Sequence, residues 1–133
     1  MATTQKIKEL NDVFSAMASI DRGALLRKNI GDESLGDVLQ PILNDLDSKA
    51  EFARSYAKGV NDTALEGIRA SFAAIVTILT AQAARSNTDY IANKPTILTQ
   101  INENMEGLLT YWPSLVAAAV VERGFLQDEG IRK

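Results

Sequence analysis

The apolar residues of this chain recur in steps of three and four along almost its whole length, and this spacing places them on one side of an α-helix. The clearest run is Leu65, Ile68, Phe72, Ile75, Val76, Leu79 and Ala83. No segment alternates apolar and polar residues for long enough to predict a half-buried strand. The sequence therefore predicts an all-α fold.

The pattern predicts a compact antiparallel bundle of four principal helices. They are expected to begin near Thr3 or Thr4, near Ser34, near Asp62 and at Pro95, with a short helical stretch over residues 24–29. The spacing of Thr63 and Glu66 is typical of a capping box. Pro41 and Pro113 lack an N–H, so helix breaks are predicted near both of them. Residues 1–126 are expected to form the helical domain, and residues 127–133 a tail or the start of a linker.

Residues 70–84, in the third predicted helix, form a run of fifteen without a charged side chain. A helix that is apolar nearly all round is either central to a soluble domain or embedded in a membrane. Fifteen residues reach only about 23 Å of a hydrocarbon core about 30 Å thick. The sequence therefore favours a central helix.

Composition excludes several classes of site, because the chain contains no cysteine and no histidine. Disulfides, thiolate nucleophiles, Cys/His zinc sites and Ser-His-Asp triads are thereby ruled out. The acidic pairs Asp45 with Asp47 and Asp128 with Glu129 lack the spacing of a calcium loop. We therefore predict no enzyme activity, no cofactor and no metal site.

The distribution of charged residues indicates which kinds of partner the chain can bind and where in the cell it is expected. The net charge is −3, and no segment shows the basic face that a nucleic-acid partner requires. The first eight residues are polar and lead into no apolar segment of the kind found in a secretory signal. These features predict a cytoplasmic protein that does not bind nucleic acid, with attachment to a membrane surface on activation as an alternative.

A second run of fifteen uncharged residues spans residues 107–121. As a core element it needs no function, whereas on the surface it would mark a contact with a partner or a membrane. The core interpretation is favoured, because the side opposite Trp112 is also apolar. If the chain is an interaction module, its contact residues are expected among Tyr111, Trp112, Phe125 and Leu126, because large apolar and aromatic side chains dominate binding hot spots.

The order of features over residues 65–115 resembles the N-terminal helical domains of fungal NLR-type receptors. The resemblance rests on the apolar stretch at residues 70–79, on residues 86–90, and on the LLTYWP sequence at residues 108–113. Residues 31–35 and 39–42 fit the same pattern. The resemblance implies a four-helix domain of the cell-death type. Such a domain precedes a nucleotide-switch module and acts by self-association or membrane targeting.

These observations together predict a non-enzymatic signalling or effector domain that works through a protein partner or through self-association. Two alternatives stay open. The first is a membrane-perturbing bundle in which the third or fourth helix leaves the core. The second is a small enzyme that uses only carboxylate, lysine or tyrosine side chains, and it would require a deep polar pocket with a displaced pKa.

Overall fold

The computed structural model describes residues 2–27, 29–30, 33–84 and 87–132, with side chains for 2–27, 36–84 and 98–122. Within these residues the chain is helical almost throughout, as predicted. The helices are α1 (Thr4–Ala18), α2 (Arg22–Leu26), α3 (Leu35–Tyr56), α4 (Asp62–Ala84) and α5 (Asn87–Arg132), with a 3-10 turn, η1 (Ala57–Gly59), after α3. A minimal antiparallel pair, β1 (Asn29–Ile30) with β2 (Glu33–Ser34), joins α2 to α3, where no strand was predicted.

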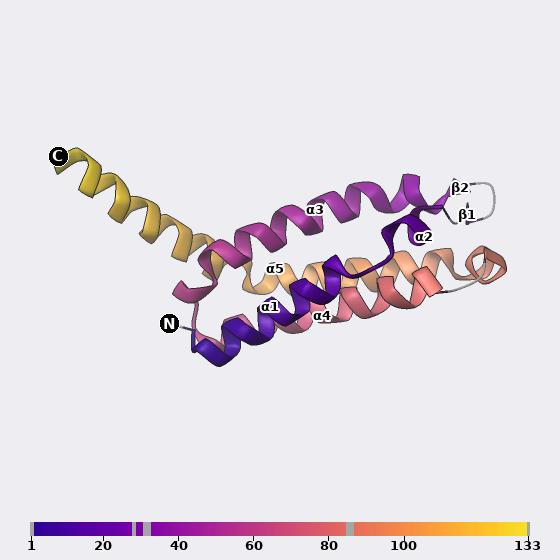
Figure 1. The fold of residues 1–133 in the computed structure, drawn as a ribbon, viewed down its shortest axis with the longest axis horizontal. Helices are drawn as coiled ribbons and strands as arrows, with labels where there is room; N and C mark the ends of the chain where they lie inside the picture. The colour runs from indigo at the N-terminus through magenta and orange to yellow at the C-terminus, as the bar shows by residue number, and fades with distance from the viewer. Residues whose placement is uncertain (1, 28, 31–32, 85–86, 133) are drawn as a thin grey trace.

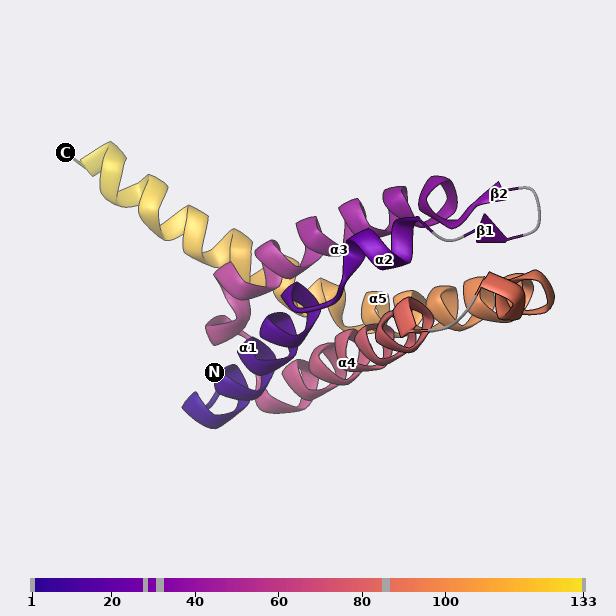
Figure 2. The same ribbon diagram turned by 45° about the vertical axis from the view of Figure 1, so that its right-hand side comes forward.

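The four longest helices run along the long axis of the molecule (Figure 1). Helix α4 packs against both α5 and α1, and the short helix α2 packs against α3 and α4. The last part of α5, drawn in yellow, continues beyond the ends of the other helices (Figures 1 and 2). Helix α5 therefore has one part packed against its neighbours and one part that projects from them.

The interior is built around α4, as the charge-free run predicts. Leu65, Ile68, Phe72, Ile75 and Leu79 are all fully buried. The ring of Phe72 meets the ring of Phe14 from α1 edge to face, with centroids 5.1 Å apart. The prediction of a central third helix is confirmed.

The helix starts are fixed by side-chain caps. Thr3 caps α1 by accepting a hydrogen bond from the Lys6 N–H, as predicted. Helix α4 is capped by Asn61, whose side-chain oxygen accepts a 2.8 Å hydrogen bond from the Ala64 N–H. The predicted capping box of Thr63 and Glu66 is wrong, because an asparagine two residues earlier already satisfies the first turn.

The predicted helix breaks near Pro41 and Pro113 are also wrong, since α3 and α5 run through them without interruption. Both prolines lie on the exposed side of their helix. Each removes the hydrogen bond to the carbonyl four residues earlier, at Asp37 and Leu109, which are exposed as well. Water can therefore replace the missing bonds, while the buried side of each helix holds it in place.

Helix α5 also extends beyond both of its predicted ends. It begins at Asn87, eight residues before Pro95, and continues to Arg132 through the residues that were predicted to be a tail. Proline is compatible with a helix start but does not require one. The predicted limit of the folded domain at residue 126 stays a prediction.

The N-terminus is tied to the turn between α3 and α4. The Ala2 N–H donates a hydrogen bond to the Lys58 carbonyl at 3.2 Å, and the Thr3 N–H donates to the Asp62 carboxylate at 2.8 Å. These bonds place the start of α1 beside the start of α4.

A cluster of charges strengthens the same contact between α1 and α4. The Glu66 carboxylate accepts hydrogen bonds from Lys6 Nζ at 2.8 Å and from Arg69 Nε at 2.9 Å. Lys6 also forms an ion pair with Glu9. Hydrogen bonds from Arg69 and then Lys6 favour the ionised carboxylate and lower the pKa of Glu66 from 4.5 to about 2.

This shift predicts a pH dependence of stability. Because the pKa of Glu66 is lower in the folded chain than in the unfolded chain, its stabilising effect is complete above about pH 4.5 and is lost as the pH falls toward about 2. Glu66→Gln should therefore be less stable than wild type near neutral pH, and the difference should shrink in acid. Urea unfolding at a series of pH values measures this. Glu103→Gln, at an exposed position on α5, is the control, and an equal pH trend in both variants would contradict the assignment.

Candidate functional site

Tyr111 and Trp112, two of the residues predicted as partner contacts, lie in the packed part of the molecule. Tyr111 is half-buried, and its ring lies against Gly67 of α4 so closely that a Cβ at residue 67 would stand within 3.0 Å of it. Only a residue without a side chain allows this approach. The contact of Tyr111 is therefore with its own domain.

Trp112 joins α5 to α3. Its ring stacks on Phe52 with centroids 5.3 Å apart, and Phe52 in turn packs against Tyr56 at 4.9 Å. The ammonium group of Lys49 stands 5.7 Å from the Trp112 ring, within the range of a cation–π interaction. These contacts fix the orientation of α5 relative to α3. The other two predicted contact residues, Phe125 and Leu126, have side chains outside the described residues.

The opposite side of α5 carries an exposed apolar surface. Among the side chains that the structure describes, all the exposed large hydrophobic residues lie here: Leu109, Val116, Val120 and Val121, at 49, 43, 64 and 72% exposure. Pro113 and Ala117 are exposed between them. We call these six residues the α5 face.

The charge-free run of residues 107–121 therefore has two different sides. Leu108, Leu115 and Ala119 are buried on one side, while the α5 face lies on the other. The apolar side opposite Trp112, which favoured a core helix in the sequence, consists of Leu109, Ala117, Ala118 and Val121, and of these Ala118 packs against the core. A helix that is apolar on both sides needs to bury only one of them, and the sequence of residues 107–121 does not indicate which side that is.

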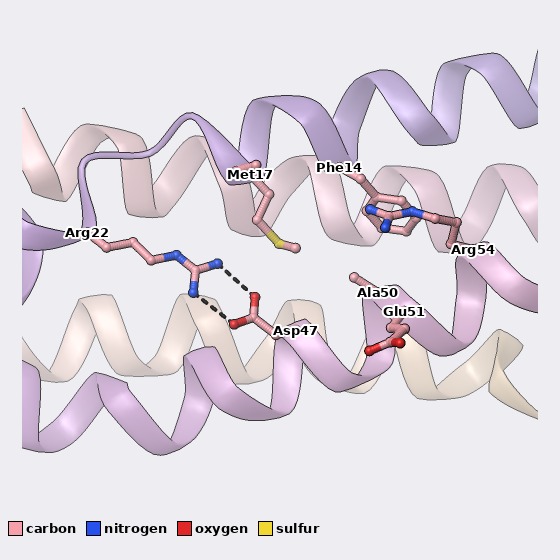
Figure 3. Close-up of a pocket in the computed structure, with 8 residues that line it drawn as sticks. Phe14, Met17, Arg22, Asp47, Ala50, Glu51 and Arg54 are labelled. Carbon is pink, nitrogen blue, oxygen red and sulfur yellow. Dashed lines mark hydrogen bonds and ion pairs between the residues drawn. The ribbon is translucent and has the colours of Figure 1, made fainter.

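A shallow cavity of about 250 Å³ lies between α1, α2 and α3 (Figure 3). Arg22 of α2 closes one end through a bidentate pair with Asp47 of α3, with distances of 2.8 and 2.7 Å. At the other end the Arg54 guanidinium stands 5.4 Å from the Phe14 ring centroid. The rest of its wall is formed by Met17, Ala18, Ala50 and Glu51.

The ionised groups at one end of this cavity, Arg22 and Asp47, form a structural ion pair. The hydrogen bonds from Arg22 lower the pKa of Asp47, and those same bonds raise the pKa of Arg22. A carboxylate held ionised in this way is a weak proton acceptor. The Arg22–Asp47 ion pair therefore joins α2 to α3.

Of the two acidic pairs that lack the spacing of a calcium loop, one forms ion pairs with basic residues and the other lies outside the described side chains. Asp45 pairs with Lys49 at 2.6 Å, and Asp47 pairs with Arg22. The side chains of Asp128 and Glu129 are among those not described. Within the described residues no group of three or more acidic side chains is placed to hold a metal ion.

In the part of the chain that the structure describes, one helix is long and apolar enough to cross a membrane. It is α4, with a mean hydropathy of 1.5 over its most apolar window, of which 44% is buried. Core helices of soluble proteins can be equally long and apolar. The full burial of Leu65, Ile68 and Phe72 agrees with a core position for α4.

Among the described residues, the α5 face is thus an apolar surface that contacts within the domain do not explain. Tyr111 and Trp112 pack the helix against α4 and α3, and its other side presents apolar groups to solvent. Comparison of the chain with protein-family models, with curated protein sequences and with solved structures found no match.

Proposed function

We propose that this chain is a non-enzymatic protein-interaction domain and that the α5 face is its contact surface. The observation that supports the proposal is the gathering of the exposed large hydrophobic side chains, among those described, on one helix between Leu109 and Val121. Monomeric soluble proteins seldom expose contiguous apolar surface unless a partner or a membrane covers it.

The packing of α5 supports the same role. The rings of Tyr111 and Trp112 are held against Gly67 and Phe52, so the backbone beneath the α5 face is fixed before a partner arrives. A surface that is already ordered loses less conformational entropy on binding. Helix α5 can therefore present Val116 and Val120 in a constant geometry.

The proposed biological setting follows from the sequence resemblance. We propose a cytoplasmic signalling or effector role of the kind found in the N-terminal helical domains of fungal NLR-type receptors, in which the four long helices act as one bundle. The all-α architecture is compatible with it. In such a role, the domain transmits a signal by binding another domain and catalyses no reaction.

A membrane-perturbing role is the second candidate, because α4 is apolar over most of its surface. It would require α4 to leave the core and expose Ile68, Phe72 and Ile75, which are now fully buried. Leakage of a dye from vesicles rich in anionic lipid tests it directly. Leakage that Val116→Ser and Val120→Ser leave unchanged would favour the membrane role over the α5 face.

The test of the interaction role is a photo-crosslinking residue placed at Val120 in the full chain, in the cells that produce it. The control carries the same residue at Ser48, an exposed position on α3. We expect protein crosslinks from residue 120 that are absent from residue 48 and that disappear in a Val116→Ser background. Equal labelling at both positions, or none at residue 120, would contradict the proposal.

A further inference from the structure

Four residues of the α5 face, together with a charged residue at each end, have a spacing that reads the same in both directions. Counted from Glu106, the steps are three, four, three, four and three, through Leu109, Pro113, Val116, Val120 and Arg123. This is the spacing of the contact positions in a pair of α-helices packed side by side. The pattern is symmetric about the point between residues 114 and 115.

We propose that the partner of the α5 face is a second copy of this chain, with the two α5 helices antiparallel about a two-fold axis. The inference rests on the proposed function and names its partner. In this arrangement the axis passes between residues 114 and 115, so Leu109 of one copy meets Val120 of the other. Pro113 meets Val116 in the layer between them. A two-fold contact requires a surface that is complementary to itself, and this spacing provides one.

The charges at the two ends of the face determine the direction. Glu106, which is exposed, immediately precedes the uncharged run. Arg123 is the second residue after the run and occupies the position that corresponds to Glu106 in the 3-4 pattern, whereas Glu122, the first residue after the run, is not one of the positions of this pattern. In the antiparallel pair, Glu106 of each copy falls in the same layer as Arg123 of the other. In a parallel pair, Glu106 would meet Glu106 and Arg123 would meet Arg123, and such like-charge contacts are unfavourable.

The position of α5 leaves room for a second copy. Within the part of the chain that the structure describes, no other helix covers the side of α5 that carries Val116, Val120 and Val121, as their exposure shows. The last part of the helix projects beyond the ends of the others (Figure 2). The layers from residue 106 to residue 123 extend over about 26 Å at 1.5 Å per residue. One pair of helices of this length gives a small interface, so we expect reversible association and not a permanent dimer.

Charge reversal in the full chain tests the inference. Sedimentation equilibrium at low salt would compare wild type with Glu106→Lys, with Arg123→Glu and with the double variant. Each single change places like charges in the same layer, and we expect the dimer dissociation constant to rise about tenfold or more, in line with the destabilising effect of like-charge pairs at helix interfaces. The double variant restores opposite charges in both layers and should return to within about threefold of wild type. Circular dichroism confirms that each variant folds.

The possible results separate this inference from the function on which it rests. Single variants that leave the dimer dissociation constant unchanged would overturn the antiparallel pair. A double variant whose dissociation constant does not return toward the wild-type value would also overturn it. A monomer at all concentrations would also overturn it. If residue 120 still crosslinks to a different protein, the interaction role stands and only the second copy is excluded. If the monomer forms no crosslink there, both proposals fail.

Discussion

Replacing Phe72 with alanine should lower the free energy of unfolding by about 3 to 5 kcal/mol. The side chain is fully buried at the centre of α4 and packs edge to face on Phe14 of α1. Its removal loses the transfer free energy of a large apolar group and leaves a cavity between two helices that can close only in part. Urea unfolding followed by circular dichroism measures the change.

Two further substitutions show whether the loss comes from this cavity. Phe72→Leu keeps most of the volume and should cost much less than Phe72→Ala. Thr77→Ala changes an exposed residue of the same helix and should lie within about 0.5 kcal/mol of wild type. If the midpoint of Phe72→Ala hardly moved, α4 would not be the central helix.

Gly67→Ala should destabilise the protein by about 1 to 3 kcal/mol, although alanine is the better helix former by about 1 kcal/mol. The added Cβ would stand within 3.0 Å of the Tyr111 ring. The ring must therefore move away from α4, and α5 loses one of the contacts that hold it there. Thermal unfolding of the variant measures the loss.

Gly107→Ala is the matched control on α5. A Cβ at residue 107 would meet only the Ser71 hydroxyl, at 3.3 Å, so the helix preference for alanine should offset most of the strain. Combining Gly67→Ala with Tyr111→Ala should cost less than the sum of the single changes, because the clash is then absent. A stabilised Gly67→Ala variant would show that the ring is not confined.

The sequence predicted the core well because burial follows a simple repeat. Leu65, Ile68 and Phe72 were identified from their spacing alone, and all are fully buried. Rules based on single residues, such as proline as a helix breaker, predicted the ends of helices less reliably. Pro41 and Pro113 were expected to break helices, but they sit on exposed sides where water can satisfy the freed carbonyls. The tertiary contacts of the buried side outweigh the local cost.

The candidate site could be predicted only in part. Residues 107–121 were recognised as unusual because they lack charge, but the prediction of contact residues chose Tyr111 and Trp112, which lie on the packed side of the helix. Tyr111 and Trp112 contact Gly67 and Phe52. Which side of α5 faces the neighbours depends on how α3 and α4 are placed. A single helix with apolar residues on both sides carries no signal that decides this.

The tie between the N-terminus and the start of α4 has a consequence for the order of folding. The ion pair of Lys6 with Glu66 joins residues 60 apart in the sequence, so the chain must close a long loop before this contact can form. Helices α4 and α5 follow one another directly and need no such closure. We expect the hairpin of α4 and α5 to form early, with α1 docking onto it in a later step. Mutations at Lys6 should then mainly speed unfolding, whereas a mutation that disturbs the contact of Gly67 with Tyr111, between α4 and α5, should slow folding.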